Sequence, residues 1–200
     1  MEGKIKLVIA DVLTPLSLSS SRSSGASLAA ALDLSAAFRA HAAFVFRVLR
    51  SLGVEAQALD DGVQEVFMVA MRRWHTYDAR GPVRPWLFGI ARRVASHQRR
   101  QRRRQLRREA SAWSRAPVPS LERGQDRRLA VDFVQDFCAT LPDHLRDVFV
   151  SMQLEDMTAQ ETAEVLDVNV NTVYTRLRRA RFLFGQAVDE RFRDIESGSQ

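Results

Sequence analysis

The chain has 200 residues, which is enough for one medium domain or two small ones and too few for a large multidomain enzyme. It carries 30 lysines and arginines against 24 acidic residues, and all but Lys4 and Lys6 are arginine. The resulting net charge of +6 favours a polyanionic partner, with nucleic acid ahead of an anionic membrane surface. The single cysteine, Cys138, excludes an intramolecular disulfide and a cysteine-rich zinc site.

Several functional classes are disfavoured by motifs that the sequence lacks. The four histidines are scattered without an HExxH or HxxxH pair, and no carboxylate cluster or phosphate-cradling glycine loop indicates catalysis. We therefore expect no metal, no cofactor and no enzymatic activity. No apolar run approaches the roughly 18 residues of a membrane span, and residues 5–18 do not resemble a signal peptide, so we expect a cytoplasmic protein.

Residues 1–32 are expected to form a flexible tail. Residues 17–30 within it are mostly Ser, Ala and Gly, which bury too little surface to offset their ordering entropy. Helical periodicity then becomes nearly continuous from Leu34 to Arg108. The first helix is expected to end at Gly53, and its apolar stripe at spacings of three and four consists of Phe38, Ala42, Val45, Leu49 and Leu52.

The second helix is expected to start at Asp60 or Asp61, and it has the strongest amphipathic pattern in the chain. Its apolar stripe consists of Val63, Val66, Phe67, Ala70, Met71 and Trp74. A loop from His75 to Arg84 then breaks the pattern. The third helix is expected to begin at Pro85, which suits the first helical position, and its buried side consists of Trp86, Leu87, Ile90, Ala91 and Val94.

Beyond Val94 arginine replaces the apolar residues, and nine arginines fall within the seventeen residues 92–108. Such a run repels itself, so we expect a solvated face that does not pack against a core. Residues 33–108 are thus expected to form one domain. Residues 109–129, with Pro117, Pro119 and Gly124, are expected to form a flexible linker.

The second helical block, residues 130–193, contains the most specific local signal, and residues 194–200 are expected to be a tail. Thr158 and Glu161 form a capping box that opens a helix through Leu166. Residues 167–169 form a three-residue turn, and a second helix starts at Val170. This pattern predicts a helix-turn-helix, with Ala163, Val168, Val173 and Leu177 between its helices. The predicted fold is all-α: two small helical domains joined by a flexible linker.

The second helix of this motif presents residue types that bind DNA in the major groove. The candidates are Asn171, Thr172, Tyr174, Thr175, Arg176, Arg178 and Arg179. The alternative is an ordinary helical hairpin with a solvated basic face. Asp167 stands where such turns usually have glycine, and Asp tolerates the left-handed backbone better than most residues.

Residues 141–149 (LPDHLRDVF), the helix-turn-helix and residues 172–181 (TVYTRLRRAR) resemble region 4 of the extracytoplasmic-function (ECF) sigma factors of the sigma-70 family. Residues 61–67 (DGVQEVF) resemble region 2.2 of that family, and residues 84–92 (RPWLFGIAR) resemble regions 2.3 and 2.4. The matches occur in the family's order and spacing. They imply an alternative sigma factor whose partners are core RNA polymerase, through the β′ clamp helices and the β-flap, and promoter DNA. An anti-sigma factor commonly holds this group inactive.

For core polymerase binding, the resemblance implies Asp61, Gln64 and Glu65, which lie beside the apolar stripe of the second helix. Helix capping is the alternative explanation, since Asp61 at the N-cap with Gln64 three residues later forms a capping box by itself. For Asp61 both roles remain open, and for Gln64 and Glu65 we favour polymerase binding.

For the −10 element, the resemblance implies the loop before Trp86 and the arginine-rich helix that follows. Tyr77 in that loop is available to stack on a base. The full candidate set is Tyr77, Arg84, Trp86, Arg92, Arg93, His97, Arg99 and Arg100. Trp74 and Trp86 also lie on apolar stripes, which indicates a core role. Where the family often has Asn and Asp after the arginine at position 92, this chain has Arg93 and His97.

Two other classes compete with a sigma factor. A self-sufficient helix-turn-helix regulator leaves residues 61–74 and the Trp86 segment without a role, and no α/β receiver pattern is present. A nucleic-acid enzyme lacks the required carboxylates, metal-ligand spacing and glycine loop. Binding to core RNA polymerase in the absence of DNA distinguishes the sigma factor from both.

Overall fold

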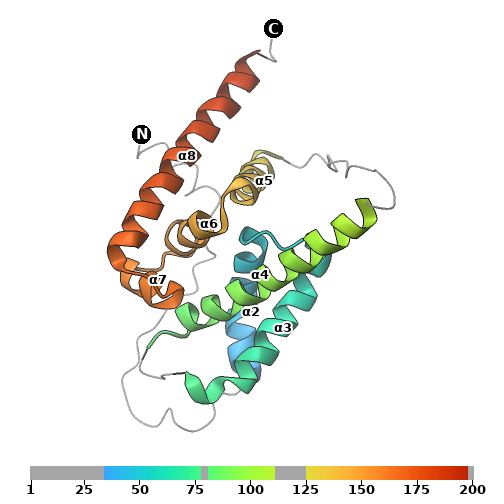
Figure 1. Ribbon diagram of the computed structural model, residues 1–200, viewed down its shortest axis with the longest axis vertical. Helices are drawn as coiled ribbons and strands as arrows, with labels where there is room; N and C mark the ends of the chain where they lie inside the picture. Colours follow the sequence, from blue (N-terminus) through green and yellow to red (C-terminus); the bar gives the residue numbers. More distant parts are fainter. Residues whose placement is uncertain (1–33, 78–80, 111–124, 198–200) are drawn as a thin grey trace.

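The computed structural model describes residues 34–77, 81–110 and 125–197, which form helices and turns without a strand (Figure 1). The elements in chain order are α2 (Leu34–Ser51), the 3₁₀ helix η1 (Ala56–Ala58), α3 (Leu59–Arg72), the 3₁₀ helix η2 (Trp74–Thr76), α4 (Val83–Ala110), α5 (Gln125–Thr140), α6 (Asp143–Phe149), the π-helical turn η3 (Val150–Leu154), α7 (Ala159–Leu166) and α8 (Val170–Ser197). The predicted all-α fold with two helical domains is confirmed. Over the described ranges, no helix is both long and apolar enough to cross a membrane.

The expected tail and most of the expected linker lie outside the described residues. The structure does not describe residues 1–33 and 111–124. The described ends of the linker segment are helical, since α4 continues to Ala110 and α5 begins at Gln125. Gln, Arg, Leu, Glu and Ala dominate both ends and are strong helix formers, which explains why the helices are longer than expected. α8 also continues beyond Arg193, to Ser197.

α2, α3 and α4 pack around one core because each contributes an apolar stripe at helical spacing. The predicted core residues that are buried are Val45, Leu49, Leu52, Val63, Val66, Phe67, Ala70, Leu87, Ile90, Ala91 and Val94. Burying each of the larger side chains contributes about 1.5–3 kcal/mol. Phe88, outside the predicted stripe of α4, is also fully buried. Gly53 closes the turn after α2 with a φ of +82°, a conformation that favours glycine.

Two helices of this domain begin earlier than predicted. α3 begins at Leu59 because η1 leads into it without a break, and its N-cap Ala58 makes no side-chain hydrogen bond. Asp61 therefore lies in the first turn and does not cap the helix, so the alternative explanation, a capping box of Asp61 with Gln64, is wrong. α4 begins at Val83, which makes Pro85 its third residue. Pro85 still lies in the first turn, where its missing N–H leaves no helical bond unmade.

Two residues of the predicted stripes are exposed. Phe38, near the start of α2, is 41% exposed, with its ring centroid 4.7 Å from that of Phe67. Met71 is 53% exposed because it lies at the edge of the α3 stripe, next to the buried Ala70. The buried face of α3 is consequently narrower than the apolar stripe that the sequence predicted.

α5 and α6 of the second domain are joined by a buried arginine, Arg146, which caps the end of α5. Its Nε donates to the carbonyl of Cys138 at 2.6 Å, and its Nη2 donates to the carbonyls of Leu141 at 2.6 Å and Ala139 at 3.2 Å. The last carbonyls of a helix lack intrahelical donors, and Arg146 donates hydrogen bonds to them. Its Nη1 lies 3.0 Å from Asp143, which balances its charge.

The helix-turn-helix forms as the sequence predicted. Thr158 Oγ1 accepts from the N–H of Glu161 at 3.1 Å, and Glu161 Oε2 accepts from the N–H of Thr158 at 2.8 Å, which completes the capping box. Asp167 ends α7 in the left-handed region, at φ 54° and ψ 53°. The core between the helices consists of Val148, Ala163, Leu166, Val173 and Leu177, with Val168 packed against it.

The two domains contact each other along α4. Figure 1 shows α7 beside the first half of α4, where Val165 Cγ1 lies 3.3 Å from the position that a Cβ on Gly89 would take. Buried apolar residues of both domains belong to one continuous cluster, which includes Phe44 of α2, Phe88 of α4 and Phe149 of α6. The sequence pattern predicted two domains joined by a flexible linker, and it did not predict this contact.

Candidate nucleic-acid interface

The first half of α8 presents a polar and basic face opposite the buried core of the helix-turn-helix. Asn171, Tyr174, Thr175, Arg178 and Arg179 are exposed, and Thr172 and Arg176 are partly exposed. All seven candidates from the sequence therefore reach solvent. The buried side of the same turns holds Val173, Leu177 and Ala180, which fixes the helix against α7 and α6 and orients the polar face outward.

Local contacts order the start of this face. Asn169 Oδ1 accepts from the N–H of Asn171 at 2.8 Å, so Asn169 caps α8. Asn169 was expected in the turn without a capping role, although Asn directly before a helix is a recognised capping signal. Thr175 Oγ1 donates to the carbonyl of Asn171 at 2.9 Å, so its hydroxyl proton is already in a hydrogen bond within α8. The side chains of Asn171 and Arg176 are the better candidates for reading base edges.

The candidate residues of α4 fall into two groups. Arg93, His97 and Arg100 are exposed, and Gln101 Nε2 lies 2.9 Å from His97 Nε2. In contrast, three arginines each contact a carboxylate of the second domain. Arg92 Nε lies 2.5 Å from Asp147 Oδ2, and Arg99 Nη2 lies 3.1 Å from Asp143 Oδ2. Arg84 Nη2 lies 3.8 Å from Glu155 Oε2. This second group is not the solvated face that the sequence predicted.

Arg99 departs furthest from the expectation of a solvated arginine. Only 11% of its side chain is exposed, and its guanidinium also donates to the carbonyl of Leu52 at the end of α2. That carbonyl belongs to the turn at Gly53, whose Cβ position would lie 3.5 Å from Arg99 Cδ. Arg99 therefore ties α4 to the end of α2. A run of arginines in the sequence does not distinguish such a residue from its solvated neighbours.

Two of the carboxylates that meet these arginines are buried. The side chains of Asp147 and Glu155 are only 5% and 2% exposed. Burial raises the pKa of Asp147, although Arg92 acts against it, and burial raises the pKa of Glu155 against the opposing charges of Arg47 and Arg84. Asp143 is more exposed: burial acts to raise its pKa, but Arg99 and Arg146 outweigh that effect and lower it.

Three aromatic side chains lie together before and at the start of α4. The ring centroid of Tyr77 lies 5.3 Å from that of Trp74 and 5.2 Å from that of Trp86, and the two tryptophans meet edge to face at 5.7 Å. Tyr77 also donates its hydroxyl to the carbonyl of Gly81 at 2.6 Å. Both tryptophans are partly buried, so each side chain packs against the protein and also exposes part of its surface to solvent.

Two of these rings, those of Tyr77 and Trp86, border a cavity of about 500 Å³ that is lined from both domains. The first domain contributes Tyr77, Trp86 and Arg93, and α7 contributes Glu161 and Glu164. An aromatic wall with a cation beside it is suited to stack and hold an unpaired base. The carboxylate of Glu161 is also held in the capping box with Thr158.

The candidate polymerase-binding residues lie on one exposed face of α3. Asp61 and Gln64 are exposed, whereas Glu65 is partly buried and its Oε2 accepts from Gln98 Nε2 at 3.1 Å. Met68 and Met71 lie on the same face and are 49% and 53% exposed. Exposed methionines beside polar residues are typical of protein-binding surfaces. Met68 was missed because its position lies off the apolar stripe; its spacing of four from Gln64 is the signal that identifies it.

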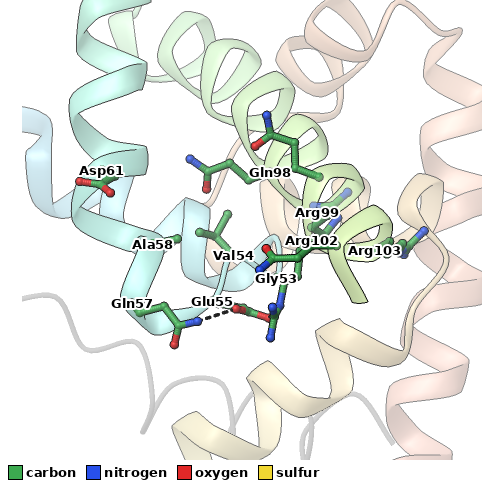
Figure 2. Close-up of a pocket in the computed structure, with 12 residues that line it drawn as sticks. Gly53, Val54, Glu55, Gln57, Ala58, Asp61, Gln98, Arg99, Arg102 and Arg103 are labelled. Carbon is green, nitrogen blue, oxygen red and sulfur yellow. Dashed lines mark hydrogen bonds and ion pairs between the residues drawn. The ribbon is translucent and has the colours of Figure 1, made fainter. Parts of the chain in front are cut away.

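A second cavity, of about 540 Å³, lies between the turn after α2 and the second half of α4 (Figure 2). Figure 2 shows Glu55 and Gln57 among the lining residues, with Gln57 Nε2 donating to Glu55 Oε2 at 2.8 Å. Arg102 Nε also donates to Glu55, at 2.8 Å. Within the described residues, no group of three or more His, Cys, Asp and Glu side chains forms a metal site.

Two families match the two halves of the chain. Residues 37–105 match Sigma-70 region 2, and residues 134–181 match Sigma-70, region 4. The RNA polymerase sigma factor HrpL of Pseudomonas syringae pv. syringae is 32% identical, over 67% of this chain and 75% of its own length. The ECF RNA polymerase sigma factor SigL of Mycobacterium tuberculosis is 30% identical, over 80% of this chain and 90% of its own.

A solved structure shares the fold. The sigma factor RpoE of Bartonella quintana, crystallised in complex with the anti-sigma factor NepR, superimposes with a TM-score of 0.64 at 19% identity. The match covers 80% of this chain and 98% of that one. Both helical domains are therefore present in the similar structure.

Proposed function

The chain belongs to the sigma-70 family and is an alternative sigma factor of the ECF group that directs promoter-specific transcription initiation, and we propose that three surfaces carry out this function. The exposed face of α3 binds core RNA polymerase, α4 with the aromatic cavity binds the −10 element, and the first half of α8 reads the −35 element. We also propose that residues 33–108 and 130–193 act as separate functional domains.

The observation that carries the −35 assignment is the division of α8 into two faces. Val173 and Leu177 are buried against α7, while Asn171 and Arg176 reach solvent near the start of the helix. The second helix of a helix-turn-helix enters the major groove with its first residues toward the bases. Asn and Arg pair with adenine and guanine edges through two hydrogen bonds each. Arg178 and Arg179, further along, are suited to phosphates or to the polymerase.

The −10 assignment is supported by the combination of aromatic rings and cations at the cavity. Melting of the duplex supplies unpaired bases, which stack on aromatic side chains with little dependence on sequence. Tyr77 and Trp86 provide the rings, and Arg93 lies at the same cavity. Arg93, His97 and Arg100 are the exposed candidates along the helix that follows.

The polymerase-binding face on α3 is the surface most directly tested by mutation. Gln64→Lys places a cation in the middle of the face without removing a core contact, since Gln64 is exposed. We expect association with core polymerase to weaken by about tenfold or more, as for other central interface residues. Gln186→Lys on α8 is the matched control, because it makes the same exchange at an exposed position on another helix. Equal affinities for both variants would rule out this face.

The location and the main partners follow from the same proposal. Core polymerase and promoter DNA are in the bacterial cytoplasm, so we propose that the protein acts there as a specificity subunit and has no catalytic role of its own. We also propose an anti-sigma factor as a partner, on the ground that RpoE of the same fold was solved with one. Run-off transcription with core polymerase and fragmented genomic DNA of the source organism tests the whole function: no specific transcript would contradict it.

A further inference from the structure

Gln98 of α4 contacts a residue on the polymerase-binding face of α3. Its Nε2 donates to Glu65 Oε2 at 3.1 Å, although the two residues lie 33 positions apart in the sequence. Both residues are partly buried. Figure 2 shows Gln98 projecting from α4, and Asp61 of α3 lines the same cavity. Gln98 therefore joins the helix that we assign to the −10 element to the face that we assign to core polymerase.

Gly62, three residues before Glu65, leaves room for this contact. A Cβ at position 62 would lie 3.4 Å from both Nε2 and Oε1 of Gln98, and 3.0 Å from Leu49 Cδ1. A side chain at this position would therefore displace Gln98 or Leu49. Glycine is a poor helix former, so its place near the start of α3 is explained by the close approach of these two side chains.

The Glu65 carboxylate needs such a contact to stay in one orientation. Asp61 lies one turn earlier on the same helix, and like charges four positions apart repel each other. A long side chain also loses rotamer freedom when it is fixed. The amide of Gln98 offsets both effects, because a hydrogen bond to a charged group is stronger than one between neutral groups. In the described part of the chain the Glu65 side chain accepts no other hydrogen bond, so its Oε1 is available to a partner.

Gln98 makes this contact at a cost to the fold. Its Oε1 is buried and has no hydrogen-bond partner among the described residues. A buried amide oxygen without a donor is unfavourable. An apolar side chain of the same length would fill the space beside Gly62 without that cost. The stability of the domain therefore does not account for a glutamine at this position, whereas the hydrogen bond to Glu65 does.

We propose that Gln98 is a positioning residue for core polymerase, which holds the Glu65 carboxylate in the orientation that the polymerase binds. This inference rests on the proposed function, because it takes the exposed face of α3 as the polymerase-binding surface. A side chain that is already ordered before association loses less entropy on binding. Gln98 acts through Glu65 and makes no contact with the polymerase itself.

Gln98→Met removes the donor and keeps the length of the side chain. Methionine fills the space beside Gly62 and leaves no buried oxygen unpaired, so the urea midpoint should equal or exceed that of the wild type. We expect association with core polymerase, measured without DNA by fluorescence anisotropy, to weaken about fivefold. Gln101→Met is the matched control, because it makes the same exchange at an exposed position of α4 whose side chain lies near His97. Equal affinities of the two variants would overturn the proposal.

A double-mutant cycle with Glu65→Ala separates positioning from other effects of the substitution. Without the carboxylate Gln98 has nothing to orient, so Gln98→Met should change the affinity by less than about twofold in the Glu65→Ala background. A fivefold loss in both backgrounds would overturn the proposal, since Gln98 would then act independently of Glu65. Wild-type affinity of Glu65→Ala itself would also overturn it.

Gln64→Lys distinguishes a failure of this proposal from a failure of the proposed function. If Gln64→Lys loses core binding while Gln98→Met keeps it, the face on α3 is correct and only the positioning role of Gln98 is wrong. If Gln64→Lys binds core polymerase as tightly as Gln186→Lys, the face itself is wrong, and so is the positioning role.

Discussion

Arg92 and Asp147 lie 55 positions apart in the sequence, yet Arg92 Nε donates to Asp147 Oδ2 at 2.5 Å across the contact between the two domains. Asp147 is buried, and its other oxygen, Oδ1, has no hydrogen-bond partner. Burial raises the pKa of this carboxyl despite the nearby guanidinium. The pair therefore places one helix of each domain side by side, at the cost of a buried carboxylate oxygen without a partner.

A double-mutant cycle measures the strength of this pair. Arg92→Ala should destabilise the folded protein because it leaves the Asp147 carboxylate buried without its cation. In the Asp147→Asn background, Arg92→Ala should lower the free energy of unfolding by less. We expect a coupling free energy of about 2 kcal/mol, within the range for residues in contact. Urea unfolding of the four proteins gives the value, and additive single effects would contradict a direct interaction.

Much of each domain could be predicted from the sequence because helical periodicity and capping are local. The stripe containing Val45 and Leu49, the capping box at Thr158 and Glu161, and the left-handed turn at Asp167 all follow from residues within a few positions of each other. The exposed face of α8 follows from the same periodicity. Each of these features is confirmed.

The contacts between the domains could not be predicted in this way. Whether an arginine is solvated or pairs with a carboxylate depends on which helix packs beside it. Arg99 and Arg100 are the same residue type in the same run, yet the side chain of Arg99 is only 11% exposed whereas Arg100 is exposed. The same limit applies to Arg146, whose partners are the carbonyls at the end of another helix. Phe88 was missed because the buried side of α4 widens where the second domain covers it.

The turn of the helix-turn-helix allows a stabilising substitution. Asp167 has a φ of 54°, a conformation that costs a residue with a Cβ roughly 1–2 kcal/mol more than it costs glycine. Asp167→Gly should therefore raise the free energy of unfolding by about 1 kcal/mol, after the larger chain entropy of glycine is subtracted. Asp167→Val should lower it, because a β-branched side chain tolerates this region least. Thermal melts of both variants and the wild type check this order of stability. A melting temperature for Asp167→Gly below that of the wild type would contradict the prediction.

Removal of the Arg146 side chain should destabilise the second domain. Arg146→Ala removes the side-chain donor of the Leu141 carbonyl and leaves the Cys138 carbonyl with only the N–H of Leu141 at 3.3 Å, at a cost of about 3 kcal/mol. Arg191→Ala, on the exposed second half of α8, is the control and should change the stability by less than about 0.5 kcal/mol. Guanidinium unfolding followed by circular dichroism gives both values. Equal effects of the two substitutions would show that Arg146 does not cap α5.

The thiol of Cys138 should be unreactive in the native protein. Cys138 is 1% exposed, and burial raises its pKa to about 12, only partly opposed by the charge of Arg146. Since the thiolate is the reactive form, its fraction stays negligible below that pKa and rises only as the pH approaches it. At pH 8 we expect no reaction with a colorimetric disulfide reagent until a denaturant unfolds the protein. Rapid reaction in the native state would contradict the packing of α5 against α6 and α8.

Promoter selection by the holoenzyme, from a library randomised over the −35 element, tests the proposed function most directly. We expect the wild type to select one preferred sequence. Asn171→Ala and Arg176→Ala should each relax the preference at one position, at a cost of about 1–3 kcal/mol. Arg179→Ala should weaken all sequences alike and lower the salt dependence of binding by about one unit. An unchanged preference in both Asn171→Ala and Arg176→Ala would contradict the assignment of α8 as the reader of this element.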